Sequence, residues 1–171
     1  MAQESESVAA TSGGEGGADP RRWLDAEEKA AWTGLVALML LLPGRLEAPL
    51  QQEHGLTLFE YLVLSHVSEA PDRCLRMSEL AALANGSLSR LSNVVKRFEQ
   101  RGLVRRFPDP ADGRYTVAAL TDDGLDVVTR AARAHLDSVR LLVLDPLCTA
   151  DLNALTAITG KLGLGPAALG G

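Results

Sequence analysis

The stretch Glu79–Arg101, with the sequence ELAALANGSLSRLSNVVKRFEQR, has the pattern of two helices joined by a tight turn. Asn85 and Gly86 mark the turn because both residue types tolerate a left-handed backbone. Ser87 is a typical N-cap for the second helix, and Gly102 is typical of the position just past a helix C-terminus. A short helix, a turn containing glycine and a longer helix together predict a helix-turn-helix.

The longer helix of this pair has two unlike faces. At about 100° per residue, its apolar side chains fall on one side: Leu88, Leu91, Val94, Val95 and Phe98. The opposite side carries only polar residues: Ser89, Arg90, Asn93, Lys96, Arg97, Gln100 and Arg101. This polar face holds no acid, whereas the alternative, a solvated helix surface, normally mixes both signs.

Such a polar face matches the chemistry of DNA. Arg and Lys pair with guanine edges, Asn pairs with adenine, and Ser binds phosphate. We therefore expect this helix and its cap to contact DNA through Ser87, Ser89, Arg90, Asn93, Lys96 and Arg97.

Short extended segments are predicted on both sides of the helix pair. Leu103–Phe107 and Tyr115–Leu120 flank the turn Pro108–Gly113, which is rich in proline and aspartate, and this pattern predicts a β-hairpin. Upstream, Cys74–Met77 is expected to be extended, and Ser78 is expected to cap the first helix of the pair.

Further helices are expected toward both ends of the chain. Asp19-Pro20 is a helix-start pattern, whereas Pro43 and Pro49 predict a kink or a split within the same helix. The predicted helices span, in chain order, residues 20–54, 57–70, 122–144 and 149–162. Residues 1–19 are rich in Gly, Ser and Glu and are expected to be disordered, as is the short tail 163–171.

Composition excludes several classes of protein. The chain of 171 residues is 46% hydrophobic and 23% charged, as in globular domains. Its two cysteines cannot build a disulfide scaffold, and no Cys/His spacing suggests a metal site. The N-terminus lacks a signal-peptide pattern, which predicts a cytoplasmic protein. No catalytic constellation stands at a convincing spacing, so neither an enzyme nor a cofactor is expected.

One apolar run, Gly34–Leu42, raises the question of a membrane span. It is shorter than the roughly 20 apolar residues that a span needs, and a break is expected at Pro43-Gly44-Arg45. A helix that is buried in a subunit interface fits this run better.

Positive charge is concentrated around the predicted helix and hairpin. Residues 87–114 hold seven cations and three acids, a net charge of +4, whereas the remaining ten cations and 19 acids give −9. The whole chain therefore carries −5. A basic segment on an acidic body is typical of a DNA-binding module, and the acidic body limits non-specific binding.

Five short motifs, in their order and spacing, resemble the multiple-antibiotic-resistance regulator (MarR) family. They are Leu56-Thr57-Leu58-Phe59-Glu60-Tyr61, Met77-Ser78-Glu79-Leu80-Ala81, Gly102-Leu103-Val104-Arg105-Arg106, Asp112-Gly113-Arg114 and Leu120-Thr121-Asp122-Asp123-Gly124. The resemblance covers about residues 20–162 and implies a mainly α fold with a small β-hairpin wing. A winged helix-turn-helix domain is then expected at residues 57–120, between a kinked N-terminal dimerisation helix at 20–56 and C-terminal dimerisation helices at 121–162.

The resemblance also implies a homodimer that binds pseudo-palindromic operator DNA, most often as a repressor, with half-sites about 10 bp apart. The recognition helix would enter the major groove, and Arg114 of the wing would enter the adjacent minor groove. Arg106, just before the wing turn, is a second expected contact. Asp112 would orient a neighbouring arginine by a salt bridge; the alternative is a simple turn residue. The apolar stripe of the helix at 122–144 would join the dimer interface.

Signal input is left open by the sequence. Many family members release DNA when a small phenolic or other aromatic acid binds, and the candidates here flank the junction of the first two helices: Arg45, His54, Tyr61 and His66. Others sense oxidants through a cysteine, and Cys74 lies beside two arginines that would lower the pKa of its thiol. The remaining alternative for the whole chain is a winged-helix protein-interaction module.

Overall fold

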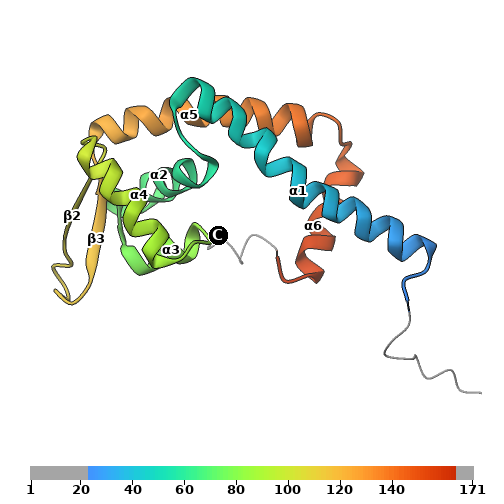
Figure 1. Cartoon of the computed structure of the whole chain (residues 1–171), viewed down its shortest axis with the longest axis horizontal. Coiled ribbons are helices and arrows are strands. Elements are labelled where there is room, and N and C mark those ends of the chain that lie inside the picture. Colours follow the sequence, from blue (N-terminus) through green and yellow to red (C-terminus); the bar gives the residue numbers. More distant parts are fainter. Residues whose placement is uncertain (1–22, 165–171) are drawn as a thin grey trace, which may run out of the picture. The chain divides into compact units, whose positions relative to one another are not determined.

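A computed structural model of the chain describes residues 23–164 (Figure 1). The predicted disordered segment 1–19 and most of the predicted C-terminal tail lie outside these residues. The chain divides between Ala37 and Leu38 into two compact units. Its elements are α1 (Ala26–His54), α2 (Leu58–Glu69), a 3-10 turn (Pro71–Arg73), β1 (Cys74–Arg76), α3 (Met77–Leu83), α4 (Leu88–Gln100), β2 (Val104–Pro108), β3 (Thr116–Leu120), α5 (Asp122–Val139), a π-helical turn (Arg140–Leu144) and α6 (Thr149–Lys161).

Helix α1 starts later than the sequence predicts. The carboxylate of Asp25 accepts hydrogen bonds from the amides of Glu27 and Glu28 and caps the helix, so residues 23–25, which were predicted to be helical, precede α1. The predicted start at Asp19-Pro20 lies outside the described residues. The helix continues through Pro43 and Pro49 to its predicted end, so it is not split. By length and composition alone it could also cross a membrane, because the expected break at Pro43 does not occur.

Helix α2 forms as its capping box predicts. The side chain of Thr57 accepts from the amide of Glu60, while the Glu60 carboxylate accepts from the amide of Thr57. The buried side of α2 forms the centre of a core to which the C-terminal part of α1, the helix-turn-helix, the sheet and α5 contribute. Its largest fully buried side chains are Phe98, Leu50, Leu56, Leu64, Leu80 and Leu91.

The helix-turn-helix consists of α3 and α4. Asn85 adopts a left-handed backbone with a φ of 49°, and Ser87 caps α4 by accepting from the amide of Arg90 at 3.2 Å. Two details differ from the predictions. Helix α3 begins at Met77 directly after the strand residue Arg76, so Ser78 is not its N-cap. Leu88, predicted to be part of the buried stripe, is 55% exposed.

A small antiparallel sheet, with the strand order β1-β3-β2, forms the wing (Figure 1). The predicted hairpin is present as β2 and β3, with Val104 opposite Leu120. The extended segment at Cys74–Arg76 joins the sheet as a third strand on the other edge of β3, with Arg76 opposite Val117. The wing is thereby tied through β1 to the residue at which α3 begins.

Helix α5 closes the core beside α2. Its predicted cap is present, since the Thr121 hydroxyl accepts from the amide of Gly124 at 3.0 Å. Only part of the apolar stripe that was predicted to join the dimer interface is exposed on this helix. Val128 is buried in the chain's own core and Leu125 packs against that core, whereas Leu136 is exposed.

Candidate nucleic-acid interface

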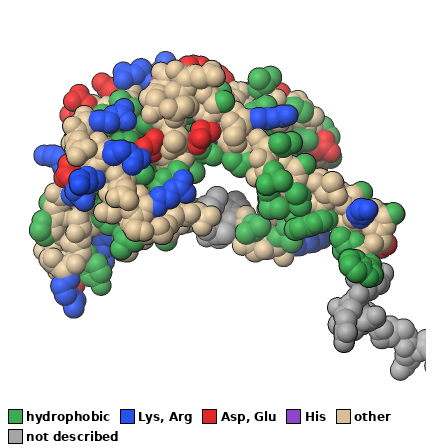
Figure 2. Space-filling view, in the orientation of Figure 1, with side chains coloured by type: hydrophobic (Ala, Val, Ile, Leu, Met, Phe, Trp, Pro, Cys, Tyr) green, Lys and Arg blue, Asp and Glu red, His purple; other side chains and the backbone are tan. Residues whose placement is uncertain are grey.

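The polar face of α4 is presented to solvent as the helical angle predicts. The seven polar residues assigned to this face are exposed, whereas Leu91, Val94, Val95 and Phe98 are buried. Figure 2 shows Lys and Arg side chains gathered over the end of the molecule that carries α4 and the β2–β3 hairpin. Within residues 23–164, Arg90, Lys96, Arg101 and Arg105 form no ion pair, so their charges are available to an anion.

The first turn of α4 packs against the start of α2. The guanidinium of Arg90 lies 3.9 Å from the centre of the Phe59 ring, a cation–π contact that holds the guanidinium against the ring although the residue as a whole stays exposed. The Ser87 hydroxyl serves the helix cap and lies 3.2 Å from the hydroxyl of Ser89. Ser87 and Arg90 therefore have local packing roles that the sequence did not reveal.

Arg97 is tied to a neighbouring helix. Its guanidinium donates to the Glu60 carboxylate at 2.6 Å, and the Arg97 side chain remains 55% exposed. Burial favours the neutral form of Glu60, but the hydrogen bonds from Arg97 and Thr57 outweigh it and lower the pKa of this carboxyl. Of the residues predicted to contact DNA, Arg97 thus already has a carboxylate partner within the chain.

Arg106 is held in the same way by the end of α4. Its guanidinium donates to Glu99 at 2.6 and 3.1 Å, and its backbone amide reaches the same carboxylate. The hydrogen bond from the Arg106 side chain lowers the pKa of Glu99. The pair joins β2 to α4, so Arg106 reaches toward the helix rather than freely into solvent.

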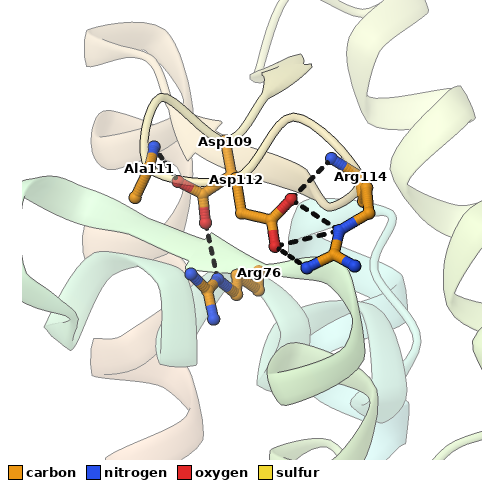
Figure 3. Close-up of polar contacts among 5 residues, drawn as sticks. All are labelled: Arg76, Asp109, Ala111, Asp112 and Arg114. Atoms are coloured by element: carbon orange, nitrogen blue, oxygen red, sulfur yellow. Dashed lines mark hydrogen bonds and ion pairs between the residues drawn. The ribbon is translucent and has the colours of Figure 1, made fainter.

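The wing presents Arg114 at its turn (Figure 3). Both oxygens of Asp112 bind the Arg114 guanidinium, with distances of 2.6 to 3.1 Å, and the Arg114 amide also donates to Asp112. The hydrogen bonds from Arg114 lower the pKa of Asp112, and the same pair raises that of Arg114. The Arg114 side chain is nevertheless 85% exposed. A bidentate pair of this kind fixes the direction of a guanidinium while leaving donors free.

A second ion pair in the wing, between Arg76 and Asp109, was missed by sequence reasoning. Arg76 Nε donates to Asp109 Oδ2 at 2.6 Å, while Asp109 Oδ1 accepts from the amide of Ala111 at 2.8 Å (Figure 3). The Asp-Pro pattern at 109–110 signals this local turn, because aspartate commonly accepts from an amide two residues on. No sequence signal links it to Arg76, which is 33 residues away.

A groove of about 290 Å³ lies between α4 and the wing. It is lined by Met77, Ser78, Leu88, Ser92, Arg106, Arg114, Tyr115 and Thr116. The hydroxyl and guanidinium groups of this lining can donate hydrogen bonds, and none of the described lining residues is acidic. The exposure of Leu88 is explained by its place in this lining.

The four candidate effector residues occupy different environments. Arg45 is exposed on α1, His54 is half-buried at the end of α1, Tyr61 is buried in α2, and His66 is half-buried in the same helix. The Tyr61 ring packs on His135 of α5, with ring centres 4.6 Å apart. His135 is not among the predicted effector residues, because α2 and α5 are far apart in the sequence and no local pattern predicts that they are in contact.

The cysteines lie at separate places. Cys74 is half-buried in β1, and its Sγ donates to the carbonyl of Asp72 at 3.3 Å. Cys148 is exposed at the start of α6. Among residues 23–164, no cluster of His, Cys, Asp and Glu side chains could hold a metal ion.

Known proteins share this arrangement. The MarR family model matches residues 54–114, which include the helix-turn-helix and the wing turn. The solved structure of Sco3205, a MarR family transcriptional regulator from Streptomyces coelicolor in complex with DNA, is 39% identical, with a TM-score of 0.79 over 83% of this chain and 89% of that chain. The chain belongs to the MarR family.

A second structure supports this assignment, and a third shares the fold. AbsC, a MarR family transcriptional regulator from Streptomyces coelicolor, is 37% identical, with a TM-score of 0.79 over 83% of this chain and 95% of that one. PcaV from the same organism, solved in complex with its natural ligand, shares the fold at 24% identity, with a TM-score of 0.64 over 82% of this chain and 97% of that one. A comparison with curated proteins found no match. This MarR family member is a DNA-binding transcriptional regulator with a winged helix-turn-helix fold.

Proposed function

We propose that the protein is a homodimeric repressor that reads a pseudo-palindromic operator with α4 in the major groove and Arg114 in the adjacent minor groove. The observation that carries this proposal is the acid-free, exposed polar face of α4 beside an 85% exposed arginine on the wing. Arg90, Asn93 and Lys96 would read base edges, and Ser89 would bind phosphate. Arg97 and Arg106 would contact DNA through the guanidinium donors that their pairs with Glu60 and Glu99 leave free.

The groove between α4 and the wing fits the DNA strand that separates the two grooves. A major groove and its neighbouring minor groove share one sugar–phosphate strand, so a protein that enters both must accommodate that strand between its two reading elements. Ser78, Ser92 and Thr116 would donate to phosphate oxygens there, and Leu88 would contact sugar carbons.

Exposed apolar side chains on the terminal helices support the homodimer. On α1 these are Trp32, Leu35, Leu38, Met39, Leu40 and Leu41; on α6 they are Leu155 and Ile158. Exposed apolar surface of this kind on a helix is typical of a subunit interface. A second copy of the chain would cover this apolar surface. The two winged helix-turn-helix domains would then lie on half-sites about one helical turn of DNA apart.

A small-molecule effector and a cytoplasmic location complete the proposal. Arg45, His54, Tyr61 and His66 remain candidates for the effector site, and Cys74 is the candidate for a redox alternative. Support for the effector comes from the family resemblance.

Operator selection from random DNA, followed by titration at two salt concentrations, tests the DNA proposal. Specific binding should weaken steeply as salt increases, because the cations displace counterions from the phosphates. A pseudo-palindromic consensus is expected from a dimer. Absence of a consensus, or affinity that does not change with salt, would contradict the proposal and favour a protein-interaction module.

Changing Arg114 to Ala should cost about 1–3 kcal/mol of operator affinity and remove base preference at the positions that flank the major-groove sites. Arg130→Ala, which removes an exposed arginine from α5, is the matched control for the lost charge. Electrophoretic mobility shift on the selected operator, and on operators altered at those flanking positions, measures both effects. Unchanged affinity and base preference for Arg114→Ala would exclude the wing from the interface.

A further inference from the structure

We propose that Arg76 is a positioning residue that sets the place of the wing and thereby aims Arg114 into the minor groove. The inference rests on the proposed function, and it adds a residue that lies outside both reading elements. Arg76 is the last residue of β1 and the residue from which α3 starts, so it belongs to the base of the helix-turn-helix.

Asp109, the partner of Arg76, is the most deeply buried charged group of the wing. It is only 9% exposed, and its Oδ2 receives Arg76 Nε at 2.6 Å. Its backbone amide donates to the carbonyl of Tyr115 at 2.9 Å, which closes the turn between β2 and β3. A carboxylate buried to this degree without a cation would be costly, so Arg76 is what allows Asp109 to close the turn in this position.

Arg76 holds both ends of the same turn. While its Nε binds Asp109 at the start, its guanidinium lies 4.8 Å from the centre of the Tyr115 ring at the end. Arg76 also pairs with Val117 across β1 and β3. One side chain therefore clamps the turn residues on either side to the strand that leads into the helix-turn-helix.

The clamp continues to the tip of the wing. The amide of Tyr115 donates to the carbonyl of Asp112 at 3.0 Å, and the side chain of Asp112 binds Arg114. The backbone of Tyr115 thus links the Arg76–Asp109 pair to Asp112, and Figure 3 shows the two ion pairs that this link connects. Among the described residues, Arg114 forms no ion pair other than that with Asp112. The direction of its guanidinium therefore depends on this turn.

A direct contact of Arg76 with phosphate is the competing role, and it makes opposite predictions. If Arg76 bound phosphate, its loss would weaken binding to all sequences and lower the salt dependence of binding. Asp109→Asn would then free Arg76 and remove an acid, so binding would tighten. If Arg76 positions the wing, Asp109→Asn instead impairs reading of the minor groove despite the more favourable charge.

The test compares Arg76→Met with Arg73→Met in the full-length protein. Methionine keeps an unbranched stem and removes one charge in both variants. Arg73 is the matched control because it lies in the same segment and forms an ion pair with exposed Asp122 at 3.0 Å, away from the wing turn. Dissociation constants are measured for the selected operator and for two altered operators. One carries G·C pairs in place of A·T pairs at the flank that the wing reads, and the other carries a substitution at a major-groove position.

We expect wild-type protein and Arg73→Met to discriminate against the altered flank by about fivefold or more, as for a mismatch at a position that is read. Arg76→Met and Asp109→Asn should lose this discrimination as Arg114→Ala does, while all variants retain discrimination at the major-groove position. Thermal unfolding verifies that the variants are folded. If Arg76→Met does not fold, Asp109→Asn, which has nearly the same shape as the native residue, carries the same test.

The inference is overturned if Arg76→Met or folded Asp109→Asn keeps the wild-type flank discrimination, or if Asp109→Asn tightens binding while flank discrimination is preserved. Failure of the proposed function gives a different result: the wild-type protein itself then yields no operator, and the inference falls with it.

Discussion

Arg97 shows how far a residue's role depends on groups distant in sequence. The helical angle places it correctly on the exposed face of α4, but it cannot reveal that Glu60, 37 residues earlier, binds its guanidinium. Glu60 at the same time completes the capping box of α2, and Glu47 of α1 accepts from the amide of Leu58 at 2.8 Å. The first turn of α2 therefore connects α1 to the recognition helix through carboxylates.

His135 leads to a prediction about pH. Its ring packs on Tyr61, and its Nδ1 is buried without a hydrogen-bond partner among residues 23–164. Burial lowers the pKa of His135, so the unfolded chain takes up a proton at a higher pH than the folded chain does. Stability should consequently fall as pH decreases below about 6.5, the ordinary histidine pKa, until the folded protein is protonated as well.

Exchanging His135 for Phe should remove this part of the pH dependence. The ring contact with Tyr61 is retained and no hydrogen bond of Nδ1 is lost, so the variant should be at least as stable at pH 6. Urea unfolding at pH 7.5 and pH 6 measures the effect, with His66→Phe as the control on the adjacent helix α2. An unchanged difference between the two pH values in His135→Phe would show that another group is responsible.

At the scale of elements, the wing is more than the predicted hairpin. Strand β1 pairs with β3, so β3 becomes the central strand of the sheet. Three residues of ordinary strand composition at 74–76 predict an extended segment, but they carry no information about which edge they join. Their pairing brings Arg76 to the wing turn. Helix α3 then begins at Met77, and Ser78 is left to line the groove.

Helix α5 is docked through a glycine. A Cβ at Gly124 would lie 2.2 Å from the carbonyl oxygen of Leu103 and 2.7 Å from Leu120 Cδ1. The same carbonyl of Leu103 accepts from the amide of Thr121 at 3.0 Å, so the first turn of α5 sits directly on the start of β2. The glycine in the motif Leu120–Gly124 is therefore required by close packing between an element end and a strand.

Changing Gly124 to Ala should lower the free energy of unfolding by about 1–3 kcal/mol, because backbone cannot move aside as a flexible side chain can. Gly44→Ala is the control, since nothing lies within 4 Å of its Cβ position and alanine improves the helix interior by about 0.5–1 kcal/mol. Chemical denaturation compares the two. Equal stability gains in both variants would refute the proposed close packing of α5.

At the scale of the whole molecule, the chain leaves apolar surface uncovered. Trp32 and Leu38 on α1 are each more than half exposed, and Leu136 on α5 and Ile158 on α6 are also exposed. Val128, by contrast, is used within the chain. A single copy of the chain thus completes the core of its winged helix-turn-helix domain. It leaves apolar side chains of its terminal helices exposed, and this exposure is the physical basis of the proposed dimer.

Leu38→Asp should dissociate the proposed dimer. The substitution places an unpaired charge in an apolar interface, at a cost of several kcal/mol, and operator affinity should fall because one head alone reads one half-site. Gln51→Asp adds the same charge at an exposed position of α1 and should leave the dimer intact. Analytical ultracentrifugation measures the assembly. A Leu38→Asp protein that remains dimeric and equally stable would remove α1 from the interface.

Interactions between residues close in sequence allowed several helices and the exposed face of α4 to be predicted. Side chains that bond to amides within three residues, as Thr57, Ser87 and Thr121 do, and the 3.6-residue period of α4 act over short distances, so their helices and the exposed basic face were predicted correctly. Helix α1 begins later than predicted, because Asp25 caps it locally. Of the two alternatives predicted for the prolines of α1, a split does not occur, because a missing donor weakens a helix without always ending it.

Contacts between residues far apart in the sequence depend on the tertiary structure. The third strand, the pairs of Arg97 with Glu60 and of Arg76 with Asp109, the packing of Tyr61 on His135 and the groove beside Leu88 all join segments whose spacing along the chain is arbitrary. A guanidinium finds its carboxylate through the geometry of packed elements, and that geometry depends on the whole core rather than on any local pattern. Periodicity and capping are properties of neighbours in sequence, whereas the aim of the wing is a property of neighbours in space.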